Sequence, residues 1–214
     1  MSDHPLDALS PLEKDALQEI MNIAFGEAAA DLSNVMNMFV TLTVPRIHIL
    51  KIGEIHPYIL DEISAEDDIS MIRQFFSGKF SGSSILIFPH GEGKKLLKLF
   101  DQTLEEASSD PGMDALAKEA LIEISNIIMC ACVSKIAGML GDVVNYSPPR
   151  FYSQDQIDGT LREAFSGHEI FAIFFKTVFH FKDFDASGFL FLITNFNTLD
   201  WLKNAIDDYL NQYA

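Results

Sequence analysis

Apolar residues recur at helical spacing near the start of the chain. After Pro11 they fall every three or four places, at Leu17, Ile20, Ala24, Ala28, Leu32 and Val35. This spacing predicts an amphipathic helix that ends before the strand-like run 40–44. The helix also has a start signal, because Ser10 can cap it, Pro11 suits its first turn, and Glu13 completes a Ser-x-x-Glu capping box.

A second helix of the same kind is predicted in the middle of the chain. Asp110 and Pro111 mark its start, and Gly138 or Gly141 can stop it. Its apolar positions are Leu116, Ala120, Ile124, Ile127 and Val133. The apolar stretch 122–139 is long, but it contains charged and amide side chains that a membrane span tolerates badly. We therefore expect no membrane insertion.

The remaining apolar segments are typical of β-strands. Those richest in β-branched and aromatic residues are 39–44, 46–52, 69–80, 85–88, 170–181 and 189–193. Their connections are too short for repeated helical crossovers, so antiparallel pairing is expected. The predicted class is α+β, with long helices packed on an antiparallel sheet. Gly, Pro, Asp and Ser favour loops at 53–67 and 153–167.

The chain contains an internal repeat. LEKDALQEIMNI, starting at residue 12, and LAKEALIEISNI, starting at residue 116, match at eight positions, and Pro45-Arg46 falls on Pro149-Arg150 at the same offset. Ser81-Gly82 and Ser187-Gly188 each precede a strand and then an amphipathic segment, at 94–104 and 199–210. The pattern predicts a duplication.

The two repeats are expected to span 1–107 and 108–214, with a loop-like seam at 106–112. Halves of this size can share one core around a pseudo-two-fold axis. The chain is thus interpreted as a single domain made of two repeats.

Each repeated helix carries polar residues on one face. Asp15, Glu19 and Asn22 stand at i, i+4 and i+7, a spacing that places them together. The second helix repeats the set as Glu119, Glu123 and Asn126. One turn further along, Gly26 and Cys130 are small, which predicts a flat surface that a partner can approach closely.

A polar helix face is most often only solvated, so the asparagines need a separate argument. Asparagine has weak helix propensity, yet it stands mid-helix in both copies. Its carboxamide can orient a water molecule, because it donates and accepts hydrogen bonds. Phosphoryl transfer depends mainly on such positioning, so an asparagine beside an anchoring glutamate is chemically adequate if a partner brings the acyl phosphate and the metal.

Composition narrows the functional classes. The chain has 214 residues, 48% of them hydrophobic, which suits a compact globular protein. Its net charge of −16, with no basic run, argues against nucleic-acid binding. The start of the chain lacks a signal-peptide pattern, and the two cysteines, Cys130 and Cys132, are expected to be buried thiols. A cytoplasmic location is therefore expected.

At the Glu-x-x-Asn residues the sequence resembles the CheC/CheX/FliY family of chemotaxis phosphatases. The family signature is Asp or Ser, Glu four residues later, Asn three residues after that, and Pro after about twenty-two intervening residues. Asp15, Glu19, Asn22 and Pro45 match it. In the second half Glu123, Asn126 and Pro149 match, whereas Glu119 stands where Asp or Ser is usual. Two signatures in one chain resemble CheC most.

The resemblance implies a function and its residues. The substrate would be phosphorylated CheY, a response regulator that keeps its own Mg²⁺, and this chain would need no cofactor. Asn22 and Asn126 would position the attacking water, and Glu19 and Glu123 would pair with the regulator's lysine. Asp15, Glu119 and Gly26 would belong to the docking face. The resemblance also implies CheD as a possible partner.

Two other readings stay open at this point. The chain could be a non-catalytic binding module for CheD or for the phosphorylated regulator. A metal-dependent or small-molecule enzyme is disfavoured, because the six histidines show no ligand spacing and no phosphate-binding glycine motif is present.

Overall fold

The protein is described by a computed structural model, which defines residues 9–62, 69–89, 111–164, 171–182, 186–195 and 198–212. Its helices are α1 (Pro11–Met36), α2 (Ile52–Glu62), α4 (Pro111–Met139), α5 (Gln154–Ala164) and α6 (Leu199–Gln212). Its strands are β1 (Val40–Leu42), β2 (Arg46–Lys51), β3 (Ser70–Ser77), β4 (Gly82–Phe88), β5 (Asn145–Tyr146), β6 (Arg150–Ser153), β7 (Phe171–Phe181) and β8 (Ala186–Asn195).

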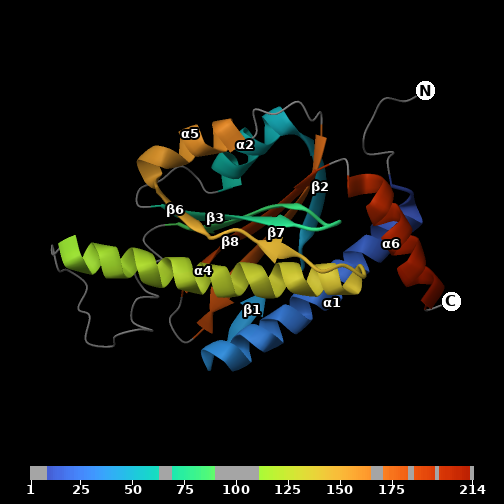
Figure 1. The fold of residues 1–214 in the computed structure, drawn as a ribbon, viewed down its shortest axis with the longest axis horizontal. Helices are drawn as coiled ribbons and strands as arrows, with labels where there is room; N and C mark the ends of the chain where they lie inside the picture. The colour runs from blue at the N-terminus through green and yellow to red at the C-terminus, as the bar shows by residue number, and fades with distance from the viewer. Residues whose placement is uncertain are drawn as a thin grey trace.

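Within the described residues the strands form one antiparallel sheet. Its order is β1-β7-β8-β4-β3-β5, with β2 also pairing β7 and β6 also pairing β3. Helices α1, α4 and α6 cover one apolar side of the sheet, and α2 and α5 cover the other (Figure 1). The predicted α+β class, with helices packed on an antiparallel sheet, is confirmed.

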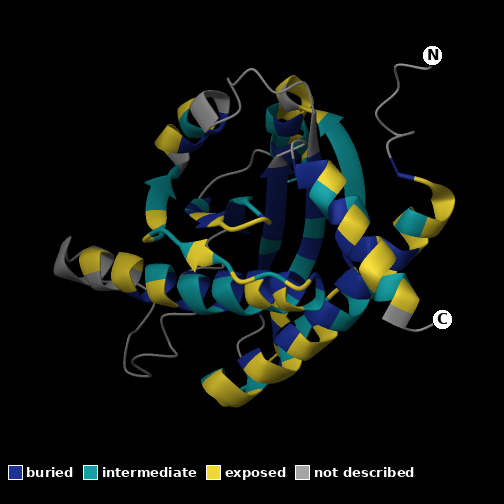
Figure 2. Cartoon of the chain, turned by 45° about the vertical axis from the view of Figure 1, so that its right-hand side comes forward, coloured by how far each residue is buried: buried dark blue, intermediate teal, exposed yellow. Residues whose placement is uncertain are grey.

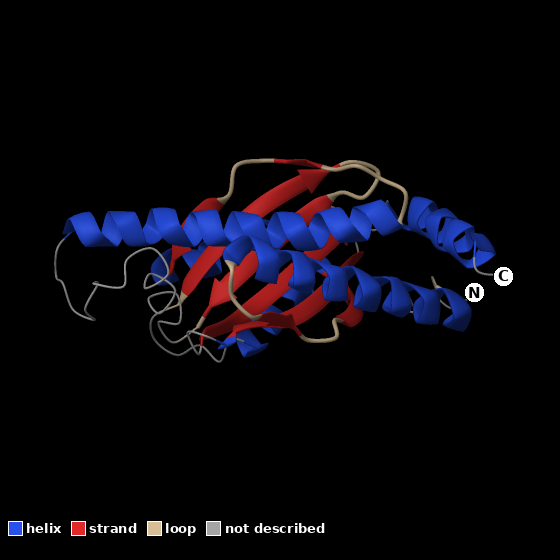
Figure 3. Cartoon of the chain, turned by 90° about the horizontal axis from the view of Figure 1, so that it is seen from below, coloured by secondary structure: helices blue, strands red, loops and turns tan. Residues whose placement is uncertain are grey.

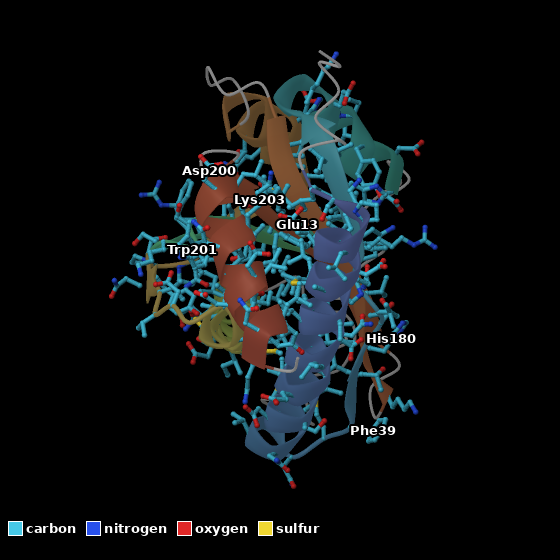
Figure 4. The ribbon with its side chains drawn as sticks, turned by 90° about the vertical axis from the view of Figure 1, so that its right-hand side faces the viewer. Glu13, Phe39, His180, Asp200, Trp201 and Lys203 are labelled. Atoms are coloured by element: carbon cyan, nitrogen blue, oxygen red, sulfur yellow. The ribbon has the colours of Figure 1, made fainter. Side chains whose placement is uncertain are left out.

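Helix α1 begins and ends where its sequence signals predict. The Ser10 side chain accepts a hydrogen bond from the Glu13 N–H, and the Glu13 carboxylate accepts one from the Ser10 N–H. These bonds lower the pKa of Glu13, and nearby Lys203 of α6 adds to the effect (Figure 4). The helix ends at Met36, and the cap residue that follows it, Asn37, adopts the left-handed conformation. Val35 was expected in the core but is 70% exposed, because it lies in the last turn, on the outer side of the helix.

Helix α4 begins at Pro111 and ends at Met139, as predicted. Gly141 then takes a positive φ of 69°, and the Asp142 N–H donates to the Ala137 carbonyl, so the glycine closes the helix end. By length and composition, Lys118–Met139 could cross a membrane, although 56% of its most apolar window is buried in the fold.

Two segments expected to be loops are helices. Helix α2 contains Pro57, and α5 contains Gly159, and these residues hid the helical pattern. Burial explains the outcome, because Ile55 and Ile59 on α2 match Ile157 and Leu161 on α5. Both pairs stand at i and i+4 and pack in one cluster on the second face of the sheet. Tertiary packing here outweighs weak propensity.

The strands of the two halves exchange partners. Strands β1 and β2 of the first half pair with β7, and β5 and β6 of the second half pair with β3. Each half keeps one antiparallel pair of its own, β3–β4 or β7–β8, and the other half adds strands to its edge.

Residues at corresponding positions of the two halves meet in space. Ile85 of β4 pairs with Phe191 of β8, and the Ser-Gly motifs place these two at the same position in each repeat. On the helices, Asp31 and Lys135 correspond and form an ion pair of 2.8 Å. Two copies related by a two-fold axis are expected to contact each other through corresponding residues at that axis. The duplication and its boundaries stay a prediction, which this register supports. The segment 94–104 and most of the seam lie outside the described residues.

Candidate functional site

The first Glu-x-x-Asn motif lies on the outer side of α1. Asp15 and Glu19 are exposed and Asn22 is half-buried, whereas Ile20 and Met21 between them are buried in the core. Figure 2 shows exposed residues along this outer side of the helix. The three polar residues are therefore available to a partner, and the carboxylates of Asp15 and Glu19 face water.

The carboxamide of Asn22 is held by a neighbouring glutamine. Gln18 Nε2 donates to Asn22 Oδ1 at 3.0 Å and also to the carbonyl of Pro45 at 3.1 Å. Pro45 is the proline of the predicted signature, and it is buried in the loop before β2. Gln18 thus ties the asparagine to the loop that carries the signature proline.

The second motif has the same exposure but a different support. Glu119 and Glu123 are exposed and Asn126 is half-buried on α4. Gln74 Nε2, from β3, donates to Asn126 Oδ1 at 2.8 Å and to the Ser147 carbonyl at 2.9 Å. Gln74 is only 1% exposed. The support for Asn126 therefore comes from the buried sheet and from the other half of the chain.

The small residues beyond each asparagine differ in their surroundings. Gly26 is exposed, and apart from its own turn of helix no atom lies within 4 Å of where its Cβ would stand. Cys130 is half-buried, and its Sγ donates to Asn126 Oδ1 at 3.4 Å. Burial raises the pKa of Cys130. Cys132 is buried, as expected. Cys130 is only half-buried, and because its thiol bonds Asn126 it is part of the second site and does not form the flat surface that was expected there.

The two motif helices lie next to each other on one face of the sheet. Figure 3 shows α1 and α4 side by side across the strands. Lys135 of α4 joins them by ion pairs to Glu27 at 3.3 Å and to Asp31 at 2.8 Å. Both asparagines are thus presented by one helical layer.

A groove of about 780 Å³ opens beside the first motif. Gln18 and Pro45 line it together with basic residues of β2 and β7, of which Lys176 forms an ion pair with Glu62. Burial, and then the charge of Arg46, lowers the pKa of His48 in the groove. None of the site residues predicted from the sequence lines it. Within the described ranges, no cluster of three or more His, Cys, Asp or Glu side chains could hold a metal ion.

Comparison with known proteins finds similarity to the CheC-like family and to chemotaxis proteins. The model of the CheC-like family matches residues 12–49, which include the first Glu-x-x-Asn motif and Pro45. The flagellar motor switch phosphatase FliY of Bacillus subtilis (strain 168) is 26% identical over 150 residues, or 68% of this chain. The predicted resemblance to the CheC/CheX/FliY family is confirmed. The match spans only 36% of that FliY, so the activity of the whole relative does not transfer directly.

Solved structures of CheC/CheX/FliY relatives share the fold. FliY from Thermotoga maritima aligns with a TM-score of 0.66 at 17% identity, covering 94% of this chain and 98% of that one. A CheX from Desulfovibrio desulfuricans aligns with a TM-score of 0.51 at 13% identity, covering 83% and 99%. At such identities the likeness concerns the fold alone.

Sequence reasoning predicted both asparagines and both glutamates as site residues, but it did not predict the glutamines that hold the asparagines. Gln18 stands four residues before Asn22, a spacing at which helical side chains meet, so this contact could have been foreseen. Gln74 gave no such signal. It lies on a strand 52 residues from Asn126 in sequence, and only the exchange of strands between the halves brings the two together.

Proposed function

We propose that the chain is a phosphatase for a phosphorylated response regulator of the CheY type. The observation that carries the proposal is the arrangement of the two asparagines. Each is half-buried beside an exposed glutamate, and each has its Oδ1 held by a glutamine. Within the described residues, no hydrogen bond donated by Nδ2 of either asparagine is present. This amide group is free to bind a water molecule or a phosphoryl oxygen.

The proposed reaction is hydrolysis of the regulator's acyl phosphate. The water oxygen forms the new bond to phosphorus, the aspartyl carboxylate of the regulator leaves, and inorganic phosphate is released with the water proton passing to solvent. Asn22 or Asn126 holds the water in line with the leaving oxygen, which is most of what catalysis requires here. The regulator contributes the acyl phosphate and the Mg²⁺.

The glutamates act in docking. Glu19 and Glu123 are exposed and lie one turn from the asparagines, so each can pair with a lysine at the regulator's active site. Asp15 and Glu119 extend the same acidic face by a further turn, and Gly26 leaves room for the partner backbone. A cytoplasmic location fits such a partner. CheD is a second proposed partner, with a regulatory role.

The test is the decay of a phosphorylated CheY from the same organism, after a small phosphodonor has been removed. The native chain should speed the decay. Asn22→Ala and Asn126→Ala should each remove one site, and the double variant should lose about a hundredfold, the usual cost of deleting one precisely placed amide. Asn34→Ala, an exposed asparagine further along α1, is the matched control and should keep full activity.

The alternative is a non-catalytic binding module for CheD or the phosphorylated regulator. It predicts that the native chain leaves the decay unchanged, with or without CheD, while it still binds one of these partners. That result would contradict the phosphatase proposal for the regulator tested.

A further inference from the structure

A common hydrogen-bond arrangement surrounds each asparagine. In both halves one glutamine Nε2 donates at the same time to the asparagine Oδ1 and to a carbonyl of the loop that carries the signature proline. The donor–acceptor distances to the asparagine and to the loop are similar in the two sites, at 3.0 and 3.1 Å for Gln18 and at 2.8 and 2.9 Å for Gln74. The same bonds to asparagine and loop are therefore made twice.

The two glutamines do not occupy corresponding positions. The helix position that matches Gln18 in the second half is Ile122. The pairing of β3 with β6, and of β7 with β2, places Thr177 at the position that matches Gln74. Thr177 donates to the Thr43 carbonyl at 2.6 Å, so it bonds the loop but has no described hydrogen bond to Asn22. Repetition of the sequence does not explain why both asparagines have a glutamine.

The bond has a chemical consequence for the asparagine. A carboxamide can turn by half a rotation and exchange its oxygen and its NH₂ group, at little cost in solvent. A donor fixed beside Oδ1 favours one of these two orientations, because the other brings two NH₂ groups together. The favoured orientation presents Nδ2 as the donor, and an attacking water or a phosphoryl oxygen needs a donor there.

We propose that Gln18 and Gln74 are positioning residues that fix the carboxamide orientation of Asn22 and Asn126. The proposal rests on the proposed phosphatase function and adds residues that the family signature does not contain. Gln74 is buried and fixed by the sheet, whereas Gln18 is half-exposed on a helix. Asn126 is therefore the better ordered of the two, even though its half departs from the signature at Glu119.

The experiment isolates each site in turn. Asn22→Ala leaves the second site alone, and Asn126→Ala leaves the first. Gln74→Thr and Gln18→Ile, which install the residue found at the corresponding position, are then measured in both backgrounds. Each should lower kcat for its own site about tenfold, the loss of one hydrogen bond, and leave KM unchanged. Each should have no effect in the other background, which serves as the control.

A second readout needs no activity. The side-chain NH₂ signals of Asn22 and Asn126 in NMR spectra of the full chain report the orientation directly. Gln74→Thr should shift the Asn126 signals and leave those of Asn22, and Gln18→Ile should do the reverse. If the native chain does not act on the regulator, the phosphatase proposal fails while these signals still test the positioning.

Three results would overturn the positioning role. One is an equal loss of rate in both backgrounds, which would mean a general effect on folding. Another is a change in KM alone. The last is a set of NH₂ signals that the glutamine substitutions do not move.

Discussion

The two halves of the molecule have the same residues where their central strands pack together, but they use different residues to hold the two asparagines. At the centre of the sheet, Gly82 and Gly188 occupy corresponding positions, and a Cβ on either would lie within 2.5 Å of a backbone carbonyl of the neighbouring strand. At the sites, in contrast, Asn22 is held from its own helix and Asn126 from a strand of the opposite half. Close packing of the strands therefore permits the same residue, glycine, in both halves. The orientation of a side chain can be fixed by donors from different elements.

The contrast follows from the physics of the two regions. Where the backbones of β4 and β8 approach each other this closely, no Cβ fits, so both copies need glycine. A half-buried carboxamide needs only one donor at hydrogen-bond distance, and that donor can come from any nearby element. Substitution of the two glycines therefore tests whether the halves are equivalent at the central strands. Substitution of the two glutamines tests whether the two sites are held differently.

The largest effect is expected from Gly82→Ala and Gly188→Ala. The new Cβ would stand 2.1 Å from the Ile193 carbonyl oxygen in the first variant and 2.5 Å from that of Ile87 in the second. Because backbone must move in both, each should lower the free energy of unfolding by about 3 kcal/mol. Denaturant unfolding measures the loss. Gly159→Ala, in open space on α5, should instead stabilise by roughly 0.5 kcal/mol. A large difference between Gly82→Ala and Gly188→Ala in the free energy of unfolding would contradict the equivalence of the two halves at this position.

A smaller and unequal effect is expected from Gln74→Leu and Gln18→Leu. Loss of the buried Gln74 leaves Asn126 Oδ1 and the Ser147 carbonyl without that donor, which should cost about 2 kcal/mol. Gln18 is half-exposed, so water can replace it and the cost should be about 0.5 kcal/mol. Gln74→Thr should recover part of the loss, because Thr177 bonds its loop from the corresponding position. Equal costs would contradict the difference in burial.

The sequence was sufficient wherever local rules apply. Ser10, Pro11 and Glu13 predicted the start of α1, and the aromatic and β-branched residues of 170–181 predicted the strand that forms β7. Helices α2 and α5 were missed because Pro57 and Gly159 lower propensity, and only packing on the sheet offsets that. Gln74 was missed because its role depends on strand exchange, which no local pattern encodes.

The smallest effect concerns Cys130, whose thiol donates to Asn126 Oδ1 and to Gln74 Oε1 in the second site. Burial raises the pKa of this thiol, so the reactive thiolate is scarce at neutral pH and becomes abundant only above the pH usual for cysteine. Labelling with a small alkylating reagent should therefore be slow at pH 7 and speed up steadily to pH 10. Because the added group displaces Asn126, labelled protein should lose activity in the Asn22→Ala background and keep it in the Asn126→Ala background. Cys130→Ser, which does not react, is the control. Equal inactivation of both backgrounds would mean that the reagent does not act through Asn126, and it would contradict the prediction.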